Sequence, residues 1–186
     1  MDLSIIIPVY NKSKLINRCL DSIFKQTTIH SYEVVLVDDG STDDSVELIK
    51  ARTEGNIILY EQQNAGPSVA RNKGVELSHG KYCAYLDADD YWRDGFIEKT
   101  VSFLVEHVDC VAVNVAQRHL TLSGEHVAPV CYNEYSKPFV LDDFFSFWAN
   151  YMHVCTGSVV IRSEVIKQIG GMRTDLRITE DLEFWA

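Results

Sequence analysis

The stretch VVLVDDGSTDDS, residues 34–45, decides the fold. Four consecutive apolar residues favour a strand that is buried on both faces, which is typical of a parallel sheet. The small and acidic residues that follow favour a turn and then a helix, because acidic side chains stabilise a first helical turn. The stretch therefore predicts a strand over Glu33–Val37 and a helix over Ser45–Arg52.

The same order of strand, turn and helix recurs on both sides of this stretch. Upstream, we expect a strand over Leu3–Val9 and a helix over Lys12–Gln26, with Asn11 or Ser13 as its cap. Such alternation predicts an α/β fold with a mostly parallel central sheet and helices on both faces. Downstream, the pattern predicts a strand over Asn56–Tyr60, a helix from Gly66-Pro67 to about Leu77 and a strand over Lys81–Leu86.

The second half is less regular. We expect its aromatic helix to build core against the second half of the sheet, although an acceptor sugar or a membrane surface would also suit aromatic faces. The expected elements are helices over Asp94–His107, Val140–Met152 and Ser163–Ile169, strands over Val108–Arg118 and Thr156–Ile161, and strand and turn over Thr121–Tyr135.

Composition excludes several classes of protein. The net charge of -10 argues against nucleic acid as a partner, because phosphate backbones require a basic surface. Five scattered cysteines without a Cys-x-x-Cys pair predict neither a disulfide framework nor a zinc site, and they favour a reducing cytoplasm. No signal peptide and no membrane span is expected.

The run AYLDADDYW, residues 84–92, places Asp87, Asp89 and Asp90 directly after an expected strand. Crowded carboxylates repel one another, and a hard divalent cation with oxygen ligands offsets that charge. Ligands bind beyond the carboxyl ends of parallel strands. The loops that should meet at that edge are Pro8–Asn11, Asp38–Asp43, Gln62–Gly66 and Asp87–Asp90.

Several motifs in this order resemble the family 2 glycosyltransferases, which have the Rossmann-like GT-A fold. The resemblance is carried by residues 4–11, 34–45, 64–74 and 84–92 and by Thr179-Glu180-Asp181. It implies one GT-A catalytic domain over 1–186, shortened at its C-terminus. Residues 1–92 would form the nucleotide-binding half and residues 93–186 the acceptor-side half.

The resemblance implies an inverting, metal-dependent transfer of a hexosyl or hexosaminyl group. The donor would be a nucleotide-sugar, with UDP-sugars favoured, and the acceptor a hydroxyl group of a saccharide or glycolipid. The cofactor would be Mn²⁺ or Mg²⁺, and the context polysaccharide or glycan biosynthesis. The location would be cytoplasmic, and peripheral association with the inner face of the membrane is open for a full-length form.

Roles follow from the resemblance, position by position. Pro8, Val9, Tyr10 and Asn11 would line the nucleotide pocket, and Asp39 would accept a hydrogen bond from the base. Arg71 and Asp87 would lie near the nucleotide and its ribose, and Asp89 would bind the metal. Asp181 would be the catalytic base, with Glu180 beside it.

Structural roles for these residues stay open at this point. Asp38 and Asp39 could form a solvated turn, Asp181 could cap a helix that begins near Leu182, and Trp92 could be core. Two other functions also stay open: a module that binds the donor without activity, and a sugar nucleotidyltransferase. The latter usually carries a Gly-rich basic loop after the first strand, where this chain has Pro8–Asn11.

Overall fold

The computed structural model describes residues 1–121, 124–127, 138–151, 154–176 and 180–185. Its centre is a six-stranded sheet in the order β3-β2-β1-β4-β8-β5. The first four strands of the chain run parallel, and β8 lies antiparallel between β4 and β5. The strands are β1 (Leu3–Val9), β2 (Tyr32–Asp38), β3 (Ile57–Glu61), β4 (Tyr82–Tyr85), β5 (Ala112–Asn114) and β8 (Val159–Arg162).

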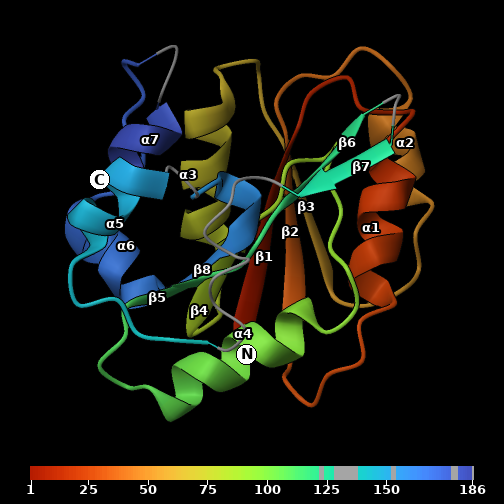
Figure 1. The fold of residues 1–186 in the computed structure, drawn as a ribbon. Helices are drawn as coiled ribbons and strands as arrows, with labels where there is room; N and C mark the ends of the chain where they lie inside the picture. The colour runs from red at the N-terminus through yellow and green to blue at the C-terminus, as the bar shows by residue number, and fades with distance from the viewer. Residues whose placement is uncertain (122–123, 128–137, 152–153, 177–179, 186) are drawn as a thin grey trace.

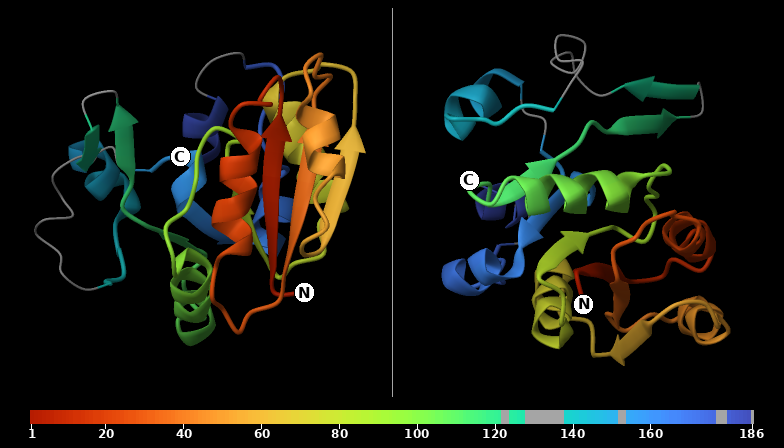
Figure 2. Two further views of the ribbon diagram at one scale, coloured as in Figure 1. Left: turned by 90° about the vertical axis from the view of Figure 1, so that its right-hand side faces the viewer. Right: turned by 90° about the horizontal axis from the view of Figure 1, so that it is seen from below.

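Helices cover both faces of this sheet (Figures 1 and 2), so the α/β fold predicted from the sequence is confirmed. One face packs on α1 (Ile16–Phe24), α2 (Ser45–Lys50) and α4 (Phe96–Glu106). The other face packs on α3 (Pro67–Leu77), α6 (Ser163–Ile169) and α7 (Glu180–Trp185).

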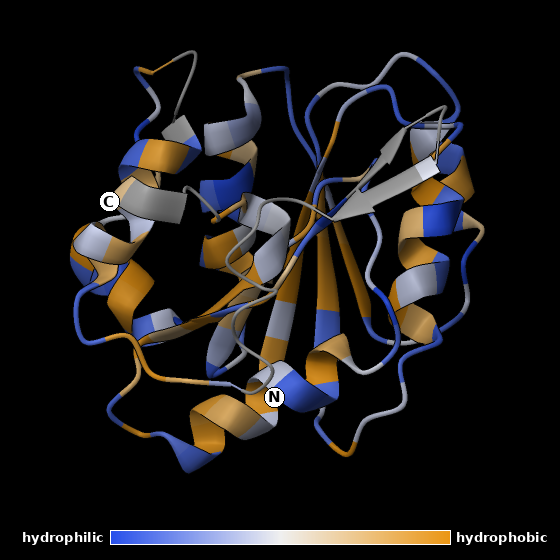
Figure 3. Cartoon of the chain, in the orientation of Figure 1, coloured by the Kyte–Doolittle hydropathy of each residue, from blue (hydrophilic) through white to orange (hydrophobic). Residues whose placement is uncertain are grey.

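Alternate side chains of the central strands pack into two separate hydrophobic cores, one on each face of the sheet. Ile5 and Ile7 point into the core with α1, whereas Ile6 points into the core with α3. All three are fully buried, and each such side chain stabilises the fold by about 1.5–3 kcal/mol. The central strands are therefore hydrophobic along most of their length, while the loops at their ends are more hydrophilic (Figure 3).

Two predictions for the second half of the chain were wrong. The strand expected over Val108–Arg118 is interrupted: β5 covers only Ala112–Asn114, and Arg118 belongs to a separate strand. Val108 and Val111, which precede β5, are 73% and 56% exposed. The aromatic helix α5 (Phe144–Tyr151) does not build core against the sheet, since none of its described side chains belongs to either buried core cluster and Phe145 is 61% exposed. Together with the hairpin of β6 (Arg118–Thr121) and β7 (Gly124–Val127), α5 projects away from the sheet (Figure 2).

Some boundaries also differ from expectation. Neither Asn11 nor Ser13 caps the first helix, because α1 begins only at Ile16 and has no side-chain cap. The segment Thr156–Ser158 forms a 3-10 turn before β8 rather than part of the strand. Helix α6 has the predicted bounds and ends at Gly170 in the left-handed conformation. The expected strand and turn over 121–135 falls partly outside the described residues.

Within the described ranges, no helix is long and apolar enough to cross a membrane. The cysteines described there, Cys19, Cys83, Cys110 and Cys155, are all free thiols. This agrees with the expectation that these residues form no disulfide framework.

A buried carboxylate ties the amino ends of the strands together. Glu33 accepts hydrogen bonds from the Ser4 hydroxyl and from the His79 backbone N–H, both at 2.6 Å. Burial alone would raise the pKa of Glu33, but these donors more than offset it, so the pKa lies below its usual value. A depressed pKa means that this carboxylate stabilises the fold at neutral pH, and that the contribution is lost as pH falls through the folded-state value.

We therefore expect Glu33→Gln to lower the free energy of unfolding at pH 7 by about 1–2 kcal/mol. The difference from wild type should narrow below a pH of about 4, where the unfolded-state carboxyl group becomes protonated. Urea unfolding at both pH values measures this, with the exposed Glu106→Gln as the matched control. An equal destabilisation at pH 7 and at pH 3 would contradict a role for the charge.

Candidate active site

The carboxyl ends of the parallel strands lie in register. Val9 at the end of β1 pairs with Asp38 at the end of β2, which pairs with Glu61 at the end of β3. β4 joins the same edge, because Leu86 donates its backbone N–H to Ile6 at 3.0 Å. The loops expected to meet at this edge therefore do so.

Asp39 holds the loop after β3. Its carboxylate accepts hydrogen bonds from the Gln62 side chain at 2.8 Å and from the backbone N–H groups of Ala65 and Gly66 at 2.8 and 2.9 Å. These donors use three of the roughly four acceptor positions of a carboxylate. The buried Asp39 is thus a fixed anionic anchor with room for about one further donor.

The loops after β1 and β2 are joined by short polar contacts. Asn11 has a positive φ of 52°, and its side-chain oxygen accepts the Thr42 backbone N–H at 2.8 Å. The Asn11 backbone N–H donates to the Ser41 hydroxyl at 2.9 Å. Tyr10 directly precedes Asn11 and is 48% exposed, so its ring is accessible to a flat ligand. Pro8 and Val9 precede it within β1.

Arg71 reaches from the buried side of α3 to the loop Asp87–Asp90, the Asp-rich loop. Its guanidinium donates to the Asp87 carboxylate at 2.7 Å, and Arg71 is buried while Asp87 is partly exposed. A charge-assisted bond of this kind orients both side chains. Two residues that the sequence assigned to the nucleotide site are therefore in direct contact.

Asp89 is paired with a residue that the sequence analysis did not single out. The Lys12 ammonium lies 2.6 Å from its carboxylate. Burial would raise the pKa of Asp89, but Lys12 more than offsets this and keeps the pKa below its usual value. Arg18 donates to the backbone carbonyl of Asp89 at 2.5 Å. Asp89 is therefore an ionised carboxylate at a partly exposed position.

The donor set fits a divalent metal that arrives with a phosphate ligand. Asp87 and Asp89 supply hard carboxylate oxygens two residues apart at the sheet edge. Among the described residues, no three His, Cys, Asp or Glu side chains gather closely enough to hold a metal ion. Mg²⁺ is usually bound by one or two carboxylates plus substrate phosphates rather than by an all-protein cage.

Asp181 approaches this edge from the first turn of α7. One oxygen of its carboxylate accepts the Leu182 backbone N–H at 2.9 Å, and the other accepts the Thr156 hydroxyl at 3.3 Å. The 3-10 turn that carries Thr156 is fixed to the Asp-rich loop, because the Trp92 indole donates to the Gly157 carbonyl at 2.8 Å. Trp92 itself is core. The side chain of Glu180 lies outside the described residues.

Aromatic packing fixes α7 on the sheet. Tyr85 of β4 makes edge contacts with Phe184 and Trp185, each with ring centroids 6.1 Å apart. Tyr85 and Phe184 are both buried. The position of Asp181 therefore depends on Tyr85, a side chain of β4 that comes much earlier in the chain.

Cys19 lies under the same loop, with its thiol 3.8 Å from the Asp87 carbonyl. Burial and the neighbouring carboxylates of Asp90, Asp87 and Asp89 raise the pKa of Cys19 to about 12. This thiol is therefore protonated at neutral pH and is a poor nucleophile.

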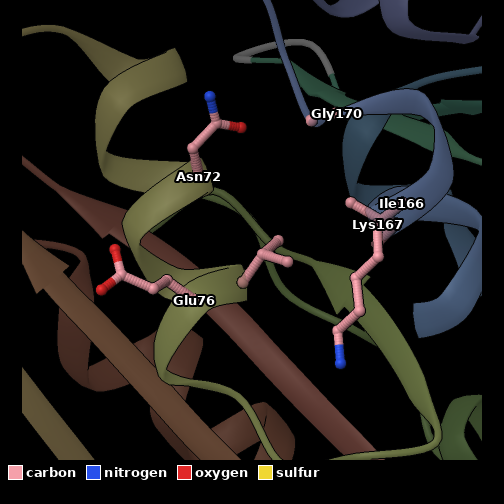
Figure 4. Close-up of a pocket in the computed structure, with 7 residues that line it drawn as sticks. Asn72, Glu76, Ile166, Lys167 and Gly170 are labelled. Carbon is pink, nitrogen blue, oxygen red and sulfur yellow. The ribbon is translucent and has the colours of Figure 1, made fainter.

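A separate groove of ≈ 300 Å³ lies between α3 and α6 (Figure 4). Its lining includes Asn72 and Glu76 on one side and Ile166 and Lys167 on the other, and none of the site residues above. Asn72 exchanges two hydrogen bonds with the Met172 backbone, at 2.7 and 2.8 Å. We interpret the groove as part of the packing interface between α3 and the turn after α6.

The family model described as Glycosyl transferase family 2 matches residues 4–170. The uncharacterized glycosyltransferase YibD of Escherichia coli is 47% identical over 90 residues, which are 47% of this chain and 26% of YibD. The minor teichoic acid biosynthesis protein GgaB of Bacillus subtilis is 31% identical over 175 residues, which are 90% of this chain and 19% of GgaB. The chain thus matches only a small part of the length of these relatives.

Among solved structures, S. aureus TarS 1-349 has a TM-score of 0.81 at 26% identity, covering 97% of this chain and 53% of that chain. The same protein was solved in complex with UDP-GlcNAc, with a TM-score of 0.77 at 24% identity over 93% of this chain and 49% of that one. The Pyrobaculum calidifontis mannosyltransferase PcManGT, in complex with GDP-Man and Mn²⁺, gives 0.69 at 21% identity over 94% and 48%. These likenesses confirm the GT-A fold.

Proposed function

Because the chain belongs to glycosyl transferase family 2, we propose that its carboxyl edge binds a nucleotide-sugar and transfers the sugar to an acceptor hydroxyl with inversion. One observation carries the proposal. The parallel strands bring Asp39, the Arg71–Asp87 pair and Asp89 to the edge that Asp181 approaches from α7. This edge is where open α/β sheets bind ligands.

Recognition of the base falls to the loops after β1 and β2. The partly exposed Tyr10 ring offers a flat face for the base. Asp39 retains about one acceptor position, which suits the imide N–H of a uracil ring. Pro8, Val9 and Asn11 shape the same pocket, and the Arg71–Asp87 pair would orient the ribose.

Asp89, with Asp87 beside it, would hold a divalent ion, Mn²⁺ or Mg²⁺. Such an ion supplies charge stabilisation for the departing diphosphate. The protein's own part is to keep the Asp89 carboxylate ionised and to position it through the Arg18 contact with its backbone.

Asp181 would accept the proton of the acceptor hydroxyl. A bond then forms between that oxygen and the anomeric carbon, while the bond from the anomeric carbon to the diphosphate oxygen breaks and the diphosphate leaves with the electron pair. One such displacement inverts the configuration and requires no enzyme nucleophile. The protonated Cys19 thiol agrees with this, since it offers no thiolate.

The complexes of TarS support a UDP-sugar as the donor, whereas PcManGT illustrates GDP-mannose on the same fold. The name of GgaB supports an acceptor in cell-surface polysaccharide synthesis. A saccharide or glycolipid acceptor and a cytoplasmic location complete the proposal.

The direct test is isothermal titration of UDP into the protein with Mn²⁺ and again with EDTA, beside GDP and ADP. We expect binding that needs Mn²⁺ and prefers UDP, because the described residues offer no group of three metal-binding side chains and a nucleotide phosphate would complete the coordination. Absence of binding by any nucleotide would contradict the proposal. UDP binding without hydrolysis or transfer of a UDP-sugar would instead support the donor-binding module.

A further inference from the structure

Lys12 forms an ion pair with Asp89, the carboxylate that the proposed function assigns to the metal. Its ammonium lies 2.6 Å from Asp89 Oδ2. The two residues are 77 positions apart. The side chain of Lys12 is 32% exposed and that of Asp89 is 43% exposed. The pair is therefore accessible from solvent, so that a ligand can reach it.

The backbone of Lys12 is fixed while its side chain is not enclosed. Its N–H donates to the Ser45 hydroxyl at 2.8 Å, and Ser45 is buried at the start of α2. The Asp89 backbone is held from the other side by Arg18. The four-carbon stem of a lysine can rotate about such an anchor and move its ammonium to another anion.

A metal ion and this ammonium compete for the single negative charge of Asp89. A metal ion bound to Asp89 Oδ2 at about 2.1 Å would lie within about 3–5 Å of the Lys12 nitrogen in its present position. Cations at that separation repel each other strongly in a partly buried site. Binding of the metal to Asp89 therefore favours departure of the ammonium.

We propose that Lys12 is the resident counter-ion of Asp89, and that it moves to the diphosphate of the donor when the metal takes its place. This inference rests on the proposed function. It follows that Lys12 affects two affinities in opposite directions. It weakens binding of the metal alone and strengthens binding of the nucleotide to the metal-loaded protein. An ammonium group is a common partner of phosphate oxygens, so the transfer leaves no charge unpaired.

The test measures two affinities in the full chain. Free Mn²⁺ is followed by electron paramagnetic resonance without nucleotide, and UDP binding is followed by calorimetry at saturating Mn²⁺. For Lys12→Met we expect about fivefold tighter Mn²⁺ binding, because the competing ion pair is lost, and about tenfold weaker UDP binding. Lys14→Met is the matched control, since it removes the same charge from an exposed position two residues away.

The outcomes separate the two proposals. Lys12→Met behaving like Lys14→Met in both titrations, while wild type binds UDP with Mn²⁺, would overturn the inference and leave the proposed function standing. Wild type that binds no nucleotide would overturn the proposed function itself. Circular dichroism confirms folding, and Lys12→Gln serves as the second variant if Lys12→Met fails to fold.

Discussion

An Asp89→Asn variant is expected to lose the Mn²⁺-dependent part of UDP binding, with affinity falling by roughly 100-fold. The amide keeps the size of the side chain but removes the charge that a hard cation needs. The backbone of Asp89 should stay in place, because the Arg18 bond goes to its carbonyl and not to its side chain. The measurement is calorimetry of UDP in Mn²⁺ and in EDTA.

The control for this variant is Asp109→Asn, which removes the same charge from an exposed position outside the site. We expect it to bind UDP as wild type does. If Asp89→Asn retained the full difference between Mn²⁺ and EDTA, the assignment of Asp89 as the metal ligand would be wrong. The Lys12 ion pair would then have a purely structural role.

An Asp181→Asn variant is expected to bind UDP within about twofold of wild type but to transfer or hydrolyse the donor roughly 10²–10⁴-fold more slowly. Asparagine can still accept the Leu182 N–H through its side-chain oxygen and donate to the Thr156 hydroxyl. The geometry of α7 should therefore survive, and only the base is lost. Release of UDP from UDP-GlcNAc, with and without acceptor, measures the rate.

Glu183→Gln is the matched control, because Glu183 is an exposed carboxylate on the same short helix. It should leave the rate unchanged. Wild-type rates in Asp181→Asn would exclude this residue as the base. A loss of UDP binding together with the rate would indicate that α7 had moved and that the effect was structural.

Local patterns were sufficient for the first half of the fold. Runs such as Val34–Val37 are apolar throughout because parallel strands are buried on both faces, and the strands and helices derived from them lie within a few residues of the observed bounds. The meeting of four loops at one edge followed from strand direction alone.

Local patterns failed where neighbours in space decide the outcome. The aromatic residues of α5 have the composition of a core helix, yet the helix projects from the sheet and leaves Phe145 exposed. The run after Val108 has the residues of one long strand, but β5 covers only Ala112–Asn114, whose partner β8 comes much later in the chain. The hydrophobic pattern of one segment contains no information on which strand will be its neighbour in the sheet.

The amino-acid sequence by itself determined the α/β class, the order of the first four strands and helices, and the identity of the carboxylates at the sheet edge. These depend on burial and on residue spacing within one segment. Only the tertiary structure decided that Lys12 pairs with Asp89, that Asp39 anchors the loop after β3, and that Thr156 contacts Asp181. Each of these contacts joins residues at least 23 positions apart, and sheet order and helix docking bring them together.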